Sequence, residues 1–180
     1  MPLSGKGTKE GRAEELSPEL LIDFEGGQFN IVPAEHMRGE KLASMIYVRV
    51  RVQNKGGAVA KGCRVYLTAL NEVYPGGIVA TALDDSKVLE WAGYHFSPMD
   101  IPPEEVAYAD VVRISKHDRG WLFSVEKLFA HQKKLQDYGG TYRFRVMVVA
   151  ENAVKSSCEF DVTYNGDWHS LRAMPVTTSL

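Results

Sequence analysis

Two segments near the end of the chain, residues 142–149 and 157–163, alternate apolar and polar residues with the period of a β-strand. A single antiparallel register matches both faces of the two segments at once. On one face it pairs apolar residues, namely Phe144 with Phe160, Val146 with Cys158 and Tyr142 with Val162. On the other face it pairs opposite charges, namely Arg145 with Glu159 and Arg143 with Asp161. This agreement predicts a β-hairpin with one face in the core and the other in water.

Further stretches alternate in the same way and predict half-buried strands. Residues 44–53 direct apolar side chains to the core and polar ones to water: Ile46, Val48, Val50 and Val52 against Tyr47, Arg49, Arg51 and Gln53. After a turn at residues 54–57, the next strand is expected to direct four residues inward, namely Cys63, Val65, Leu67 and Ala69. Residues 106–115 alternate loosely, with one face expected to hold Val106, Tyr108, Val112 and Ile114. Residues 87–91 predict a short strand.

Turn residues separate these strands, and the pattern predicts an all-β antiparallel sandwich of about seven strands with long loops. At most one short helix is expected, over residues 126–136. We divide the chain into a flexible leader at 1–18, a single β-sandwich domain at 19–166 and a C-terminal tail at 167–180. The tail is expected either to lie as a strap across the sandwich or to be disordered.

Charge and hydrophobicity exclude several functional classes. Lys and Arg number 21 against 23 Asp and Glu, a net charge of −2, whereas nucleic-acid binders carry a strong basic surplus. No apolar run approaches the roughly 20 residues that a membrane helix needs, and the N-terminus has no apolar signal-peptide segment. We therefore expect no nucleic-acid partner and no membrane segment. As written the chain predicts a cytoplasmic protein, or an extracytoplasmic one if it is a fragment of a longer anchored or secreted protein.

Two parts of the chain resemble known sandwich families. Residues 50–67, with Asn54, Gly57, Ala60, Val65 and Leu67, are similar to the opening of CARDB-type domains, which are adhesion-related immunoglobulin-like sandwiches of bacteria and archaea. The sequence Ile101-Pro102-Pro103-Glu104-Glu105 and the strand after it are similar to a proline turn and strand of the same family. The closing hairpin resembles the last strands of a fibronectin type III domain, where Tyr142 matches the corner tyrosine that bonds to an upstream loop.

The resemblance implies an immunoglobulin-like sandwich that acts as an interaction module, and it carries over no catalytic residue. The chain differs from both families in length, since such sandwiches have roughly 100 residues. The additional residues lie at 74–100 and 115–140, which are expected to be long loops or an added strand and helix.

Titratable and metal-ligating residues predict neither a metal site nor a cofactor. Five histidines are spaced unlike any zinc or metalloprotease motif: His36, His95, His117, His131 and His169. In an immunoglobulin-like strand order, Cys63 and Cys158 lie on the two strands that flank the Tyr142 strand, about 9.5 Å apart. This separation exceeds the reach of a disulfide, so we expect two buried free thiols.

We expect a non-catalytic protein–protein interaction module, an adaptor or accessory domain of a prokaryotic protein, with a protein partner or self-association. The alternative is a carbohydrate-binding module that binds a saccharide on an aromatic platform. The outward arginines favour either an ion-paired sheet face in water or a binding face for an acidic partner or a sugar-like ligand. A hydrolase dependent on His117 or His169 is the least favoured class. The candidate binding surface comprises Tyr47, Arg49, Arg51, Tyr66, Trp91 and Trp121.

Overall fold

The computed structural model describes residues 16–27, 30–38, 41–80, 83, 85–93, 96–116, 121–127 and 139–176. The strands in these ranges are β1 (Leu20–Asp23), β2 (Ile31–Arg38), β3 (Lys41–Asn54), β4 (Ala60–Tyr74), β5 (Gly77–Ala80), β6 (Lys87–Val88), β7 (Glu90–Trp91), β8 (Met99–Ile101), β9 (Val106–Ser115), β10 (Trp121–Phe123), β11 (Gly140–Ala150), β12 (Ala153–Tyr164) and β13 (Arg172–Pro175). A single turn of 3₁₀ helix, η1 (Trp168–Ser170), precedes β13.

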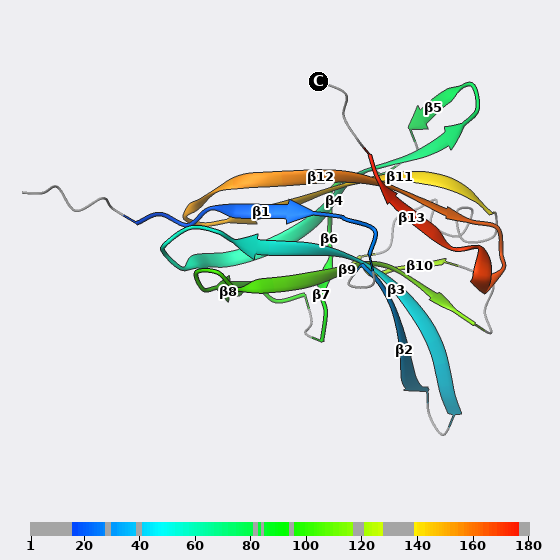
Figure 1. Ribbon diagram of the computed structural model, residues 1–180, viewed down its shortest axis with the longest axis horizontal. Coiled ribbons are helices and arrows are strands. Elements are labelled where there is room, and N and C mark those ends of the chain that lie inside the picture. Colours follow the sequence, from blue (N-terminus) through cyan, green and yellow to red (C-terminus); the bar gives the residue numbers. More distant parts are fainter. Residues whose placement is uncertain are drawn as a thin grey trace, which may run out of the picture.

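The strands form two antiparallel sheets that pack face to face. The first sheet has the order β1-β3-β9-β10, with β2 also paired to β3 and β7 also paired to β9. The second sheet has the order β13-β12-β11-β4-β5, with β6 and β8 also paired to β4. Figure 1 shows the two layers edge-on, with β11 and β12 in the upper layer and β9 in the lower. The predicted all-β sandwich is therefore confirmed, with more strands than expected.

The closing hairpin has the register predicted from the sequence. Phe144 pairs with Phe160 on the core face, and the bidentate contact of Arg143 with Asp161 on the outer face has N···O distances of 2.8 and 2.9 Å. The free edge of β12 pairs with β13, so residues 172–175 belong to the sandwich although the sequence assigns them to the tail.

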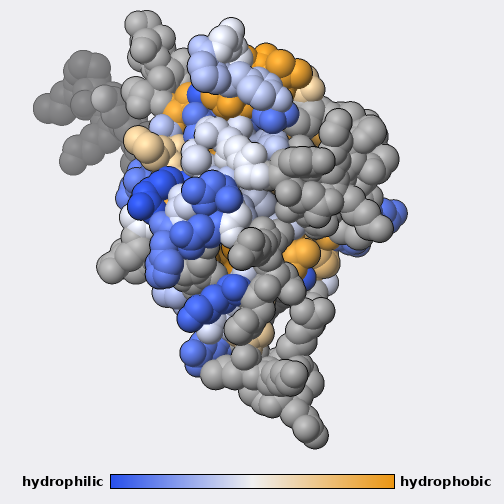
Figure 2. All heavy atoms as spheres, turned by 90° about the vertical axis from the view of Figure 1, so that its right-hand side faces the viewer, coloured by the Kyte–Doolittle hydropathy of each residue, from blue (hydrophilic) through white to orange (hydrophobic). Residues whose placement is uncertain are grey.

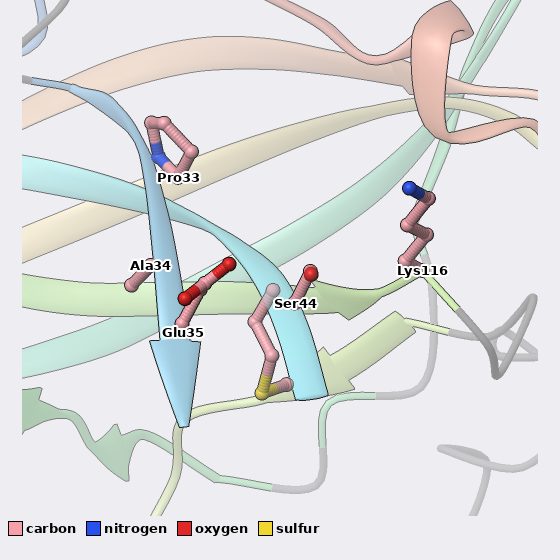
Figure 3. A pocket seen from close by; sticks show the side chains of 6 residues that line it. Pro33, Ala34, Glu35, Ser44 and Lys116 are labelled. Atoms are coloured by element: carbon pink, nitrogen blue, oxygen red, sulfur yellow. The ribbon is translucent and has the colours of Figure 1, made fainter. Parts of the chain in front are cut away.

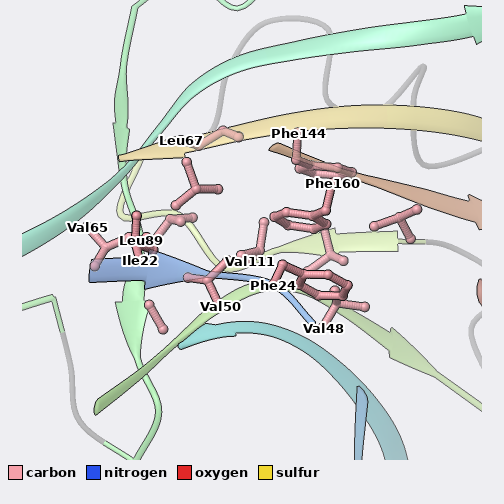
Figure 4. Packing of buried hydrophobic residues seen from close by; sticks show 14 of the residues in the cluster. Ile22, Phe24, Val48, Val50, Val65, Leu67, Leu89, Val111, Phe144 and Phe160 are labelled. Carbon is pink, nitrogen blue, oxygen red and sulfur yellow. The ribbon is translucent and has the colours of Figure 1, made fainter. Parts of the chain in front are cut away.

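The core fills the space between the sheets and has an aromatic and an aliphatic part. Phe24, Phe160 and Phe144 stack in series, with ring centroids 4.3 and 5.4 Å apart. Trp121 packs edge-on against Tyr142 at a centroid distance of 5.2 Å. Aliphatic side chains from both sheets fill the remainder (Figure 4), among them Ile22, Val48, Val50, Val65, Leu67, Leu89 and Val111. Removal of this apolar surface from water is the main force that holds the layers together.

A β-bulge in β4 changes which residues reach the core. The register shifts where Arg145 pairs with Ala69 and Val146 pairs with Leu67, so Thr68 is the extra residue with no residue opposite it in the β11 register. Because the extra residue reverses the alternation beyond it, Leu70 is buried in the core at 1% exposed. The predicted inward position of Ala69 is therefore wrong.

A second bulge, in β9, corrects the face predicted for residues 106–115. The register shifts between Val48 and Arg49 on β3, which leaves Val111 of β9 without a partner. Val111, Val112 and Ile114 are all fully buried, whereas Val106 is 41% exposed and Tyr108 is half-buried. The alternation in this strand is broken by the extra residue, and a uniform period of two could not predict it.

The additional residues at 74–100 contain further strands. The short strand predicted at 87–91 divides into β6, which pairs with β4 of the second sheet, and β7, which pairs with β9 of the first sheet. The chain therefore passes from the second sheet to the first at Leu89, whose side chain is buried in the core at 1% exposed. The helix predicted at 126–136 lies almost wholly outside the described residues. Within the described ranges, no helix has the length and apolar character needed to cross a membrane.

Candidate functional site

The structure divides the six predicted surface residues among three places. Tyr47, Arg49 and Arg51 lie on the outer face of β3 in the first sheet, whereas Tyr66 lies on the outer face of the second sheet. Trp91 and Trp121 belong to the core, at 2% and 1% exposed. These residues therefore do not form one surface.

An aromatic platform does not form from these rings because most of them are buried. Tyr47 is only 5% exposed although it lies on the outer face of its sheet, and both tryptophans pack inside the sandwich. Tyr66 is half-buried beside Val88 of β6 and Met147 of β11. A saccharide platform needs flat aromatic faces open to water, so the predicted set of rings is corrected on this point.

The arginines on β3 are neutralised within their own sheet. Arg49 donates from Nε to Oδ1 of Asp110 on β9 at 2.5 Å, and its guanidinium lies 5.1 Å from the centre of the Tyr47 ring. Arg51 contacts Asp23 of β1, with 3.1 Å between Nη2 and Oδ2. This geometry corresponds to the ion-paired face that was one of the two alternatives for the outward arginines.

Burial shifts the pKa values of two titratable groups on this face. Asp110 is 4% exposed, and desolvation raises the pKa of its carboxyl above the ordinary value, although the neighbouring Arg49 charge acts in the opposite direction. Burial likewise raises the pKa of the Tyr47 hydroxyl, against the effect of Arg113. The charges of Arg49 and Arg51 are thus paired within the sheet, which leaves these two arginines little capacity to attract a charged ligand over distance.

A hollow of about 500 Å³ lies where the β2–β3 hairpin leaves the sandwich (Figure 3). Its lining combines apolar walls with a carboxylate, a hydroxyl and an ammonium group: Pro33, Ala34, Glu35, Ser44, Met45 and Lys116. The backbone nitrogen of Lys116 donates to the carbonyl of Ser44 at 3.0 Å, which ties the end of β9 to β3. Its polar groups come from three parts of the first sheet, with Glu35 on β2, Ser44 on β3 and Lys116 directly after the end of β9.

The two cysteines are free, as predicted. They lie on β4 and β12, the strands that flank β11, and Cys63 is fully buried while Cys158 is partly buried. Burial raises the pKa of the Cys63 thiol to about 11 and that of Cys158 to about 12. Both thiols are therefore protonated at neutral pH and are poor nucleophiles. The described residues contain no group of three side chains that could hold a metal ion.

Asn54, one of the residues that carry the resemblance to CARDB-type domains, is the centre of a buried network of hydrogen bonds. This side chain is 0% exposed, and its Oδ1 accepts hydrogen bonds from the backbone nitrogens of Glu19 and Gly56 at 3.2 and 3.0 Å. Its Nδ2 donates to the carbonyls of Ala58 and Ile101 at 2.7 and 2.9 Å. We call this set of contacts the Asn54 joint; it ties β1, β3 and β8 together. The upstream loop expected to bond to Tyr142 lies outside the described residues.

The β4–β5 hairpin, residues 71–80, is an exposed apolar element. β4 ends at Tyr74, the turn is Pro75-Gly76, and every residue of β5 is exposed. The large apolar side chains on it are open to water, with exposed fractions of 47% for Tyr74, 50% for Ile78 and 56% for Val79. Figure 1 shows the hairpin extending away from the two layers, and Figure 2 shows hydrophobic surface at the top of the molecule, at the height of this hairpin.

Most of this hairpin lies within the additional residues at 74–100 and is not among the predicted site residues. A signal was present, because residues 73–83 contain no charged side chain in a chain with 24% charged residues. An uncharged run that also contains Ile78 and Val79 indicates burial, yet a turn at Pro75-Gly76 indicates a surface position. Cover over the hairpin would satisfy both signals, and the described residues leave Ile78 and Val79 exposed.

Comparison of the chain with protein-family models, with curated proteins and with solved structures finds no match.

Proposed function

We propose that the protein is a non-catalytic protein–protein interaction module that binds its partner through the β4–β5 hairpin. The observation that carries this proposal is the exposure of Ile78 and Val79 on opposite faces of one short edge strand. An edge strand presents unpaired backbone donors and acceptors, and an apolar side chain on each face gains by burial. Strand addition to such an edge is a general mode of protein recognition.

The other edge strands support the proposal by contrast. Natural proteins protect edges with charges and prolines, and the other exposed edges in the described part of the chain carry them. Examples are Asp23 on β1, Pro33 and Glu35 on β2, Asp100 on β8, and Arg172 and Pro175 on β13. β10 lacks both kinds of residue, but its Trp121 and Phe123 are buried. β5 alone among these strands is exposed, apolar and unprotected.

The strand order supports the proposal that the module is immunoglobulin-like. β1, β3 and β9 correspond in order to strands A, B and E of an immunoglobulin-like sandwich, and β4, β11 and β12 correspond to strands C, F and G. Together with the resemblance to CARDB-type and fibronectin type III domains, this order favours an adaptor or accessory domain of a prokaryotic protein. In this assignment β5 is an additional edge strand that pairs with the end of strand C.

The test compares a hairpin variant with a matched control. The double variant Ile78→Asp/Val79→Asp places charges on both faces of β5, and Val154→Asp places one charge on an 84% exposed valine at the opposite end of β11 and β12. Immobilised wild type and Val154→Asp are expected to retain the same stoichiometric protein partner from a lysate of the source organism. The double variant should retain at least about tenfold less. Equal retention by all three proteins contradicts the proposal.

A further inference from the structure

We infer that the strand that covers β5 is β5 of a second copy of this chain, paired antiparallel across a two-fold axis. This inference rests on the proposed function, because it names the partner of the same hairpin. The resulting dimer joins the two β13-β12-β11-β4-β5 sheets into one continuous sheet through their β5 edges. Three properties of the edge support a second copy: its backbone groups, its side chains and its charges.

The backbone groups that are free on β5 can be assigned from the hairpin register. Tyr74 pairs with Gly77 across a two-residue turn, and Glu72 pairs with Val79. In a hairpin with such a turn the flanking residues form the hydrogen-bonded pair, and the pairs then alternate. The backbone groups of Gly77 and Val79 therefore point toward β4, and those of Ile78 and Ala80 point outward from the sheet.

These outward groups complement themselves under a two-fold rotation. When Ile78 of one copy lies opposite Ala80 of the second copy, each pair exchanges two backbone hydrogen bonds, and the rotation generates the second pair. Val79 then lies at the axis, opposite Val79 of the second copy. This register places apolar side chains beside apolar side chains on both faces of the sheet. The dimer is closed, because both copies use the same β5 edge and neither leaves it free for a third copy.

Charge does not oppose this pairing. Residues 73–83 are uncharged, and the nearest acidic side chain on the paired strands, Glu72, lies on β4. The two copies of Glu72 are separated by three strand spacings, about 14 Å, which exceeds the screening length at physiological salt. Pairing of β5 with β13 of another copy is less favourable, because Arg172 and Pro175 occupy that edge and such a head-to-tail contact would not close.

The first test is the mass of the protein in solution as a function of concentration. Sedimentation equilibrium between about 1 µM and 1 mM is expected to show wild type rising from 20.1 kDa to about 40 kDa. Val79→Lys brings two ammonium groups together at the axis and should raise the dissociation constant at least about tenfold. Val154→Lys, which changes an exposed valine far from β5, should dimerise like wild type.

The second test measures the register directly. Opposed residues of a pair that is not hydrogen-bonded have Cα atoms about 4.5 Å apart, within the range of a disulfide. Under mild oxidation, Val79→Cys is therefore expected to form a covalent dimer, whereas Val154→Cys remains monomeric. Both variants retain Cys63 and Cys158, so the comparison controls for the native thiols.

The outcomes separate the two proposals. A wild-type chain that remains at 20.1 kDa throughout, or a Val79→Lys variant that dimerises like wild type, overturns the pairing of β5 with itself. If the chain is monomeric but the Ile78→Asp/Val79→Asp variant still loses a lysate partner, only the self-pairing is wrong. If neither a dimer nor a hairpin-dependent partner is found, both proposals are overturned.

Discussion

Two Gly-Gly pairs lie at turns of the molecule and have opposite surroundings. Gly56-Gly57 lies in the Asn54 joint between β3 and β4, and Gly76-Gly77 lies in the β4–β5 hairpin. A Cβ atom on Gly56 would lie 2.2 Å from the carbonyl oxygen of Ser17, whereas nothing lies within 4 Å of one on Gly76. The first turn is enclosed by the chain that enters β1, and the second is open.

The difference shows that a turn signal in the sequence marks a change of direction and carries no information about packing. At the Asn54 joint the polar groups are paired inside the protein, and the structure around them is closed. On the β4–β5 hairpin the apolar groups have no cover from the described part of the chain, and this is why we assign the partner-binding role to it.

The largest loss of stability is expected for a substitution of Asn54, at the centre of the Asn54 joint. Asn54→Ala removes four hydrogen bonds and leaves the carbonyl of Ile101 and the backbone nitrogen of Glu19 without these partners. We expect the free energy of unfolding, measured by urea denaturation, to fall by about 3–5 kcal/mol.

The control for Asn54 is a second asparagine that bridges strands but is exposed. Asn152 accepts from the backbone nitrogen of Lys61 and donates to the carbonyl of Val59. Because water replaces these partners, Asn152→Ala should cost about 1 kcal/mol or less. Equal losses for the two variants would show that burial of Asn54 is not what makes the joint important.

The next comparison is between the two glycine turns. Gly56→Ala forces residues 17–19 away from the turn and should destabilise the fold by about 2–3 kcal/mol. Gly76→Ala has free space and no positive φ, and its free energy of unfolding should change by about 0.5 kcal/mol or less. Urea denaturation of both variants measures the contrast. A large loss in Gly76→Ala would mean that the hairpin is more constrained than its exposure indicates.

A smaller difference in the loss of stability is expected between a variant that breaks a buried ion pair and one that breaks an exposed ion pair. Arg49→Ala leaves the buried Asp110 carboxylate without its partner and should cost about 2 kcal/mol at pH 7. Arg145→Ala removes an exposed partner of Glu159 and should cost about 0–1 kcal/mol.

The pH dependence of the Arg49→Ala loss follows from Asp110. Burial raises the pKa of Asp110 above its usual 3.8, so the folded state binds the proton more tightly than the unfolded state. The contribution of this group to stability therefore falls as pH rises through the raised pKa. Removal of Arg49 raises the pKa further, and the loss caused by Arg49→Ala should grow as the pH rises above about 4. A loss that is constant with pH contradicts this role of Asp110.

The sequence by itself determined the sandwich class, the β11–β12 register and the two ion pairs along that hairpin. These features depend on alternation within a strand and on pairing between neighbours in the chain, both of which are visible in residues such as Phe144 and Arg145. The free state of the cysteines was also predictable, because strand order sets the distance between Cys63 and Cys158.

Only the tertiary structure decided which surfaces are open. Trp91 and Trp121 are buried because β7 and β10 lie along β9 over the core, and these short strands have no regular alternation to predict their orientation. The bulges in β4 and β9 reverse the inward faces, since one inserted residue changes the phase of all that follow. The exposure of Ile78 and Val79 likewise depends on the place of β5 as the last strand of its sheet, beside β4 on the side away from β11, which is a property of the assembled sheet.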